Sequence, residues 1–242
     1  MSAPDGQAVP VRPRLVVPAY FHPGLQPQQW QWLAEHPSRV WLVILNVASG
    51  PGTRPQRAFR EAADLLRRAG VGVIGYIDTD YGHVPMPQAM AEAGRYQDWY
   101  GVRGMCLDRV AAGPEQVRYY AELAARIRAE DLDVVFFNHG THPAEAYARH
   151  ADLLGTFEGP WPAYQRLHMP RWTQRWAPEK FYHVVHSVPV DKLADARQLA
   201  VSRRAASVYI TERSGPNPYD ALPADYGVGD GRPGGRHRKE LT

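Results

Sequence analysis

Five short apolar runs along this chain each end on an acidic or amide side chain, and helix-like stretches separate them. The residues that end these runs are Asn46, Asp78, Asp108, Asn138 and Glu158. Apolar runs of this length indicate strands that are buried on both faces of a parallel sheet. Three further runs, at 15–20, 181–188 and 207–211, bring the series of predicted strands to eight.

The segments between the runs have the apolar spacing and the proline and glycine boundaries that are typical of helices. Helices are predicted over 27–35, 55–69, 88–100, 114–130, 143–149 and 191–203, whereas 159–180 is expected to be irregular. On the 114–130 helix, the inward-facing residues are expected to be Tyr119, Leu123, Ala124 and Ile127.

Roughly eight strand–helix units in order predict an α/β protein with the (β/α)₈ TIM-barrel architecture. The expected barrel spans 13–226, with a flexible arm at 1–12 and a disordered tail at 227–242. The length of 242 residues fits one barrel of about 250 residues. A doubly wound open sheet is the alternative, but the chain lacks the glycine-rich phosphate loop that often accompanies that fold.

Composition narrows the class of protein. Cys106 is the only cysteine, so no intramolecular disulfide can form, and its apolar surroundings indicate a buried, unreactive thiol. The net charge is +3 without a Lys/Arg block in the body of the chain, so no nucleic-acid partner is expected. No apolar stretch is long enough to span a membrane, and residues 1–14 lack the apolar middle of a signal peptide. We expect a monomer.

Asp108 and Glu158 form the strongest candidate catalytic pair. They end the fourth and sixth predicted strands, and active sites of barrel enzymes lie at the carboxyl ends of the strands. Two opposed carboxylates are what glycoside hydrolysis requires, because one protonates the leaving oxygen and the other attacks or activates water. The alternative is a structural role, as helix caps or as a buried ion pair of Asp108 with Arg109.

Further residues at the same end of the barrel could bind a substrate. Asp78 could contact sugar hydroxyls or amines, or it could cap the turn that continues to Asp80. Asn46 and Asn138 could supply amide hydrogen bonds or cap loops. Aromatic side chains that follow the strands could stack on sugar rings or pack in the core; they are Tyr20, Phe21, Tyr81, Trp99, Tyr100, Trp161, Tyr164 and Trp172.

The histidines raise the question of a metal site. His139 and His142 are three residues apart, as are His183 and His186, but a catalytic zinc needs three convergent ligands. We therefore expect neither a metal nor any other cofactor. His186, near the end of the seventh strand, is expected to be a hydrogen-bonding residue of the site.

Several motifs together resemble the spherulin 4 (spherulation-specific) family. The matching segments are 17–20, 44–52, 75–82, 107–109, 138–140, 156–159 and 217–223. The resemblance implies a (β/α)₈ barrel and a polysaccharide as the binding partner. Characterised fungal relatives are glycoside hydrolases that cut α-1,4-linked N-acetylgalactosamine within galactosaminogalactan, a biofilm and cell-wall polysaccharide. The resemblance to the family also implies a secreted or cell-surface protein.

One position departs from the family pattern. The strand-four motif of the relatives carries an Asp, matched by Asp108, followed by a Glu, where this chain has Arg109; the strand-six Glu is matched by Glu158. We expect Arg109 to contact the substrate and to disfavour a cationic, deacetylated glycan. It could also lower the pKa of Asp108, leaving Glu158 or Asp78 as the acid.

Two alternatives to a glycosidase remain open from the sequence. One is a carbohydrate-binding barrel that has lost catalysis through the change at Arg109. The other is a metal-dependent hydrolase on the same fold.

Overall fold

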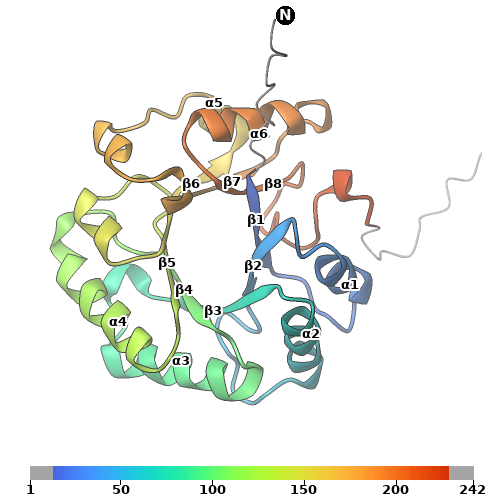
Figure 1. The fold of residues 1–242 in the computed structure, drawn as a ribbon, viewed down its shortest axis with the longest axis vertical. Helices are drawn as coiled ribbons and strands as arrows, with labels where there is room; N and C mark the ends of the chain where they lie inside the picture. The colour runs from blue at the N-terminus through green and yellow to red at the C-terminus, as the bar shows by residue number, and fades with distance from the viewer. Residues whose placement is uncertain (1–12, 229–242) are drawn as a thin grey trace, which may run out of the picture.

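The computed structural model describes residues 13–228, which form one closed barrel of eight parallel strands in the order β1 to β8 (Figure 1). The strands are β1 (Arg14–Ala19), β2 (Val40–Leu45), β3 (Gly72–Asp78), β4 (Gly104–Asp108), β5 (Val134–Asn138), β6 (Leu153–Pro160), β7 (Phe181–His186) and β8 (Ser207–Ile210). The predicted fold class is confirmed. The predicted arm at 1–12 and residues 229–242 of the predicted tail lie outside the described residues.

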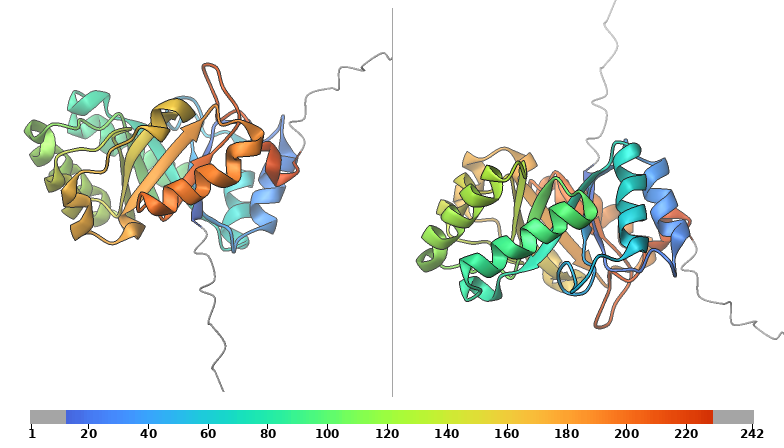
Figure 2. Two further views of the ribbon diagram at one scale, coloured as in Figure 1. Left: turned by 90° about the horizontal axis from the view of Figure 1, so that it is seen from above. Right: turned by 90° about the horizontal axis from the view of Figure 1, so that it is seen from below.

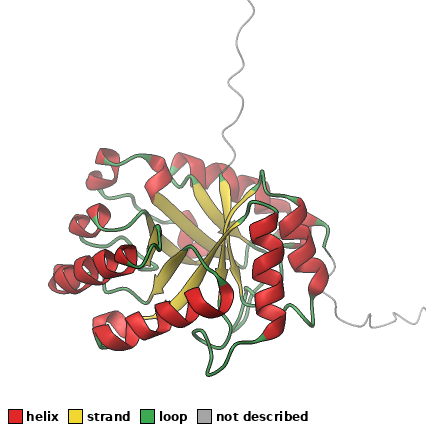
Figure 3. Cartoon of the chain, turned by 60° about the horizontal axis from the view of Figure 1, so that its bottom comes forward, coloured by secondary structure: helices red, strands yellow, loops and turns green. Residues whose placement is uncertain are grey.

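Helices surround the barrel and cover the outer faces of the strands (Figures 2 and 3). They are α1 (Pro27–Glu35), α2 (Arg57–Arg68), α3 (Met86–Tyr100), α4 (Val117–Ala129), α5 (Trp161–Gln165) and α6 (Leu193–Ser202). Apolar side chains of the strands and helices form the core between these two layers.

The structure corrects three predicted elements. The stretch predicted as a helix at 143–149 is a 3₁₀ turn at Glu145–Arg149, because little chain separates the extended residue Ala144 from β6. The stretch predicted as irregular contains α5 and two 3₁₀ turns, each preceded by an extended residue. Tyr120, not Tyr119, faces the core of α4. A 3₁₀ turn precedes α4 and shifts the phase of the helix relative to one that begins at Pro114.

No α-helix follows β8 within residues 13–228. Residues 211–228, here called the closing segment, cover that side of the barrel instead. Its 3₁₀ turn, Ala224–Tyr226, lies beside α1, where the ring of Tyr226 stacks on Trp32 with 4.9 Å between ring centroids. The same segment brings Tyr219 to the mouth of the barrel.

A bulge in β6 determines which way Glu158 points. In the pairing with β7 the register shifts between Gly155 and Phe157. Thr156 and Phe157 both face the outer layer: Thr156 Oγ1 lies 3.1 Å from a ring nitrogen of His183, and Phe157 packs in the cluster beneath α5 and α6. A bulge adds one residue to a strand and so reverses the alternation of the side chains that follow it. Glu158 therefore faces the barrel mouth.

Candidate active site

One side-chain amide connects the two predicted carboxylates. Nδ2 of Asn138, at the end of β5, donates to Asp108 Oδ1 and to Glu158 Oε2, each at 2.8 Å. The two accepting oxygens therefore lie at most about 5.6 Å apart, twice the length of one bond. The structure thus brings Asp108, Asn138 and Glu158 together, as their places at the ends of neighbouring strands predict.

Two tyrosines that are not among the predicted site residues bind the remaining carboxylate oxygens. Tyr76 Oη donates to Asp108 Oδ2 at 2.8 Å, and Tyr219 Oη donates to Glu158 Oε1 at 2.6 Å. Burial raises the pKa of both phenols, so they are hydrogen-bond donors at neutral pH. Tyr76 lies two residues before Asp78, so alternation along β3 could have placed it on the inner face. Only the tertiary structure shows that Tyr219 lies beside Glu158.

The pKa of Asp108 is raised above its usual value. Burial is the largest cause and the neighbouring charge of Glu158 is the second, and together they outweigh the hydrogen bonds from Tyr76 and Asn138. The backbone N–H of Arg109 lowers this pKa, while its guanidinium pairs with Asp78. The net shift of the Asp108 pKa is nevertheless upward, so Arg109 does not bring it below its usual value.

The Arg109 side chain forms ion pairs with two other carboxylates. Its guanidinium donates to Asp78 Oδ2 at 2.8 Å and to Asp80 Oδ1 at 2.5 Å, and it lies 4.9 Å from the ring centroid of Tyr81. The ion pair of Arg109 with Asp108, one of the structural alternatives, is not formed. Because two carboxylates balance the charge of Arg109, this residue does not give the groove the uncompensated positive charge that was expected to repel cationic glycans.

Asp78 caps the turn that follows β3. Its Oδ1 accepts the backbone N–H of Asp80 at 2.8 Å, so both carboxylate oxygens already have partners. Asp80, Tyr81 and Arg109 all have positive φ values, of 43°, 56° and 51°. Such strained backbone in residues other than glycine gathers at functional sites. Tyr81 is 49% exposed beside this turn, so it remains accessible to a ligand.

The other predicted binding residues have separate environments. Tyr20 lies edge-on to Tyr76 and Tyr219, with centroid distances of 5.8 and 5.6 Å, and so adjoins both carboxylates. Asn46 Oδ1 accepts the Gly50 N–H at 3.2 Å, which is the loop cap that the sequence left open. His186, at the end of β7, contacts Ser187 Oγ at 3.0 Å. Its role in the site stays a prediction.

Buried aromatic and histidine side chains account for other predicted contacts. Tyr164 is fully buried and bonds to the ring of His183, so it belongs to the core and not to a groove. Burial lowers the pKa of His139 and His142 to about 4, and that of His183 to about 3. Within residues 13–228, no group of three or more His, Cys, Asp or Glu side chains is placed to hold a metal ion. In the same residues, no helix is long and apolar enough to cross a membrane.

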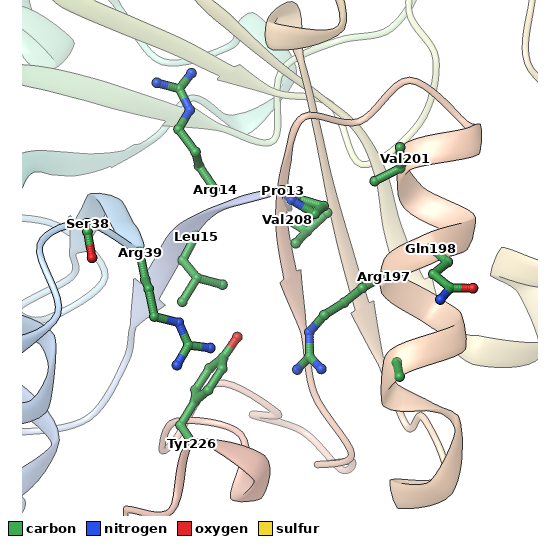
Figure 4. Close-up of a pocket in the computed structure, with 11 residues that line it drawn as sticks. Pro13, Arg14, Leu15, Ser38, Arg39, Arg197, Gln198, Val201, Val208 and Tyr226 are labelled. Carbon is green, nitrogen blue, oxygen red and sulfur yellow. The ribbon is translucent and has the colours of Figure 1, made fainter. Parts of the chain in front are cut away.

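A pocket of about 500 Å³ lies at the opposite end of the barrel, away from the carboxylates. It is bounded by the starts of β1 and β8 and by α6, and among the described residues three arginines but no carboxylate line it. Figure 4 shows Arg39 and Arg197 approaching Tyr226 from two sides, and their guanidinium carbons lie 5.0 and 5.7 Å from its ring centroid. This pocket lacks the acid–base groups that the barrel mouth provides.

These features define a (β/α)₈ barrel with a paired-carboxylate site at the carboxyl ends of its strands. The chain belongs to the spherulation-specific family 4, whose model, Spherulin4, matches residues 14–227. It is 28% identical over 148 residues to Spherulin-4 of Physarum polycephalum. That match covers 60% of this chain but only 44% of the relative, so the chain corresponds to less than half of that protein.

Solved structures share the fold. The Aspergillus clavatus Sph3 structure, in complex with GalNAc, superposes with a TM-score of 0.77 at 22% identity and covers 90% of this chain and 95% of Sph3. A chitinase domain from Pyrococcus furiosus superposes with a TM-score of 0.56 at 16% identity, and the match covers 91% of this chain and 94% of the chitinase domain. A deoxyribose phosphate aldolase from Aeropyrum pernix superposes with a TM-score of 0.51 at 14% identity, and the match covers 83% of this chain and 84% of the aldolase. Since the same barrel carries such different chemistries, function has to be argued from the site.

Proposed function

We propose that this chain is a glycoside hydrolase that cuts within an α-1,4-linked N-acetylgalactosamine/galactosamine polymer, with Asp108 and Glu158 as the reacting carboxylates. The observation that carries the proposal is the single amide of Asn138, which holds an oxygen of each carboxylate at 2.8 Å. A pair of carboxyl groups held this close is the arrangement that glycosidic bond cleavage requires.

The two carboxylates have different environments, which suggests their roles. Burial and the charge of Glu158 raise the pKa of Asp108, which suits this carboxyl to the role of proton donor. Asp108 then protonates the glycosidic oxygen as the bond breaks, while Glu158, which is solvent-exposed, attacks the anomeric carbon. In the second step Asp108 takes a proton from water, and the water releases the sugar from Glu158.

Support for an amino-sugar polymer comes from the relatives and from the mouth of the barrel. The chain belongs to the family of Spherulin-4, and the structure of Sph3, which has the same fold, contains GalNAc. The exposed ring of Tyr81 offers an apolar face on which a sugar can stack. Asp78, Tyr20, Asn46 and Arg109 would shape the groove around it. A polymeric substrate of this kind is extracellular, so we place the protein outside the cell or at its surface.

Arg109 supports a second candidate function. It stands where the resemblance to the family implies a glutamate, and its guanidinium forms ion pairs with Asp78 and Asp80. If the missing acid is essential, the barrel binds glycan without cutting it.

Incubation with purified α-1,4-N-acetylgalactosamine/galactosamine polymer, followed by mass spectrometry of the products, tests the proposal. We expect oligosaccharides from the wild-type protein and none from the Glu158→Gln variant. Their acetylation pattern would identify the sugars that the groove accepts. An absence of products from wild type, together with retained binding to the polymer, would reject the hydrolase and favour the binding barrel.

The spacing of the carboxylates predicts the stereochemistry of cleavage. Retaining glycosidases have carboxyl groups about 5–5.5 Å apart, and inverting ones roughly 6.5–9.5 Å. The upper limit of about 5.6 Å for the amide-linked oxygens fits retention. Proton NMR during the first minutes of digestion should therefore show the α anomer at the new reducing end before mutarotation. Initial formation of the β anomer would contradict this prediction.

A further inference from the structure

We infer that Gly155 is a positioning residue: by lacking a side chain, it provides the space in which the Asn138 amide sits while it holds Asp108 and Glu158 together. Gly155 touches neither carboxylate and would act only through Asn138. The consequence for turnover rests on the proposed function, whereas the consequence for the geometry of the carboxylates does not.

The space beside Gly155 is filled by Asn138. The two residues are register partners on the adjacent strands β6 and β5. A Cβ at position 155 would lie 2.2 Å from Asn138 Oδ1, 3.1 Å from its Cγ and 3.2 Å from its Cα. The backbone of Gly155 does not itself require glycine, because its φ lies outside the left-handed region. Glycine is needed here for space and not for conformational freedom.

The asparagine is held at one end only. Its Nδ2 donates to both carboxylates, while its Oδ1 is buried and has no hydrogen-bond partner among the described residues. A methyl group at position 155 would meet the Oδ1 end. The side chain can relieve a 2.2 Å contact most easily by rotating about its χ angles, and that rotation takes Nδ2 away from the carboxylates.

Loss of the amide would change the titration of Asp108. The hydrogen bond from Asn138 lowers the pKa of Asp108, against burial and the charge of Glu158, which raise it. Removing that bond should therefore raise the pKa further. Other ionisable groups near Asp108 include its register partner Asp78 and Tyr76 on β3, Cys106 on β4, Tyr20 after β1 and Tyr219 of the closing segment.

A double-mutant cycle on the full chain tests the inference. Gly155→Ala and Asn138→Ala should each lower kcat on the polymer by about 10²-fold with little change in KM, since misplaced reacting groups cost rate more than binding. Because Gly155 acts only through Asn138, the kcat of the double variant should equal that of Asn138→Ala alone, within about twofold. The free energy of unfolding is not expected to show the same non-additivity as kcat. In the double variant the new Cβ at position 155 still lies 3.2 Å from the Cα of residue 138. Gly94→Ala, at a helix position where a Cβ meets nothing within 4 Å, is the control and should keep wild-type kcat.

Carbon-13 NMR titration of the Asp108 carboxyl, assigned with Asp108→Asn, gives a second readout that needs no turnover. Gly155→Ala and Asn138→Ala should raise the pKa of Asp108 to the same extent. If wild type proves inactive on the polymer while the titration behaves in this way, the proposed function fails and the positioning role stands. Multiplicative losses in the cycle, or an Asp108 pKa unchanged in Gly155→Ala, would overturn the inference.

Discussion

Replacing Asp108 with asparagine is expected to lower kcat on the polymer by about 10²–10⁴-fold, the usual contribution of a general acid. Asparagine preserves the shape of the side chain and can still bond to Asn138 and Tyr76, so the groove should keep its affinity. Because the acid must be protonated, wild-type kcat/KM should fall as the pH rises through the raised pKa of Asp108, and this limb should be absent in Asp108→Asn. The variant should keep much more of its kcat/KM on aryl glycosides with good leaving groups, because bond cleavage then needs no acid, whereas the second step still lacks its base.

The same substitution should stabilise the protein at neutral pH. The usual aspartate pKa of 3.8 applies to the unfolded chain, and the folded state has a higher value. Between these two values the folded protein holds a proton that the unfolded chain has released, so stability falls as the pH rises through this window. Asparagine avoids that loss. We expect a gain of about 1 kcal/mol at pH 7, or roughly 2–4 °C in Tm, that disappears as the pH falls towards 3.8.

Thermal unfolding from pH 3 to pH 8 measures this effect. Asp98→Asn, which changes an exposed aspartate on the outer helix α3, is the matched control and should leave Tm nearly unchanged. An Asp108→Asn protein that is less stable than wild type at pH 7 would show that the carboxylate stabilises the fold, and the assignment of Asp108 as the acid would lose its physical basis.

Removing the Glu158 carboxylate should have the larger effect, because the nucleophile cannot be bypassed by a better leaving group. Glu158→Ala is expected to lose at least about 10³-fold in kcat on both polymer and activated aryl glycosides. The truncated side chain leaves room beside Asn138 and Tyr219 for a small anion. Sodium azide should therefore restore cleavage of the activated substrate and yield the β-glycosyl azide.

Rates with and without azide, and NMR of the azide product, check this prediction. The contrast between the two variants is diagnostic. The rate of Asp108→Asn should depend on the quality of the leaving group, whereas the rate of Glu158→Ala should depend on added azide. Glu158→Ala that remains fully active on aryl glycosides without azide would mean that Glu158 is not the nucleophile. A Tyr219→Phe variant, which removes the phenolic donor but keeps the ring, separates loss of the carboxylate from loss of its positioning.

The sequence alone determined the barrel and its mouth. Eight apolar runs separated by helical stretches can be buried only as parallel strands with covering helices, and polar residues at the ends of such runs must gather at one rim. That reasoning correctly placed Asp108, Asn138 and Glu158 together, because strand ends in a closed barrel lie side by side. It required no knowledge of side-chain conformation.

Only the tertiary structure decided how those side chains are oriented and paired. Simple alternation from Gly155 would turn Glu158 outward, and the bulge at Thr156 reverses this through pairing with β7, a strand distant in sequence. Arg109 follows Asp108 in the chain, yet its guanidinium pairs with Asp78 and Asp80 because the turn after β3 lies within its reach. Tyr219 reaches Glu158 from a segment 61 residues away. Local sequence specifies strands and their ends, whereas hydrogen-bond partners depend on register and loop paths, which long-range packing selects.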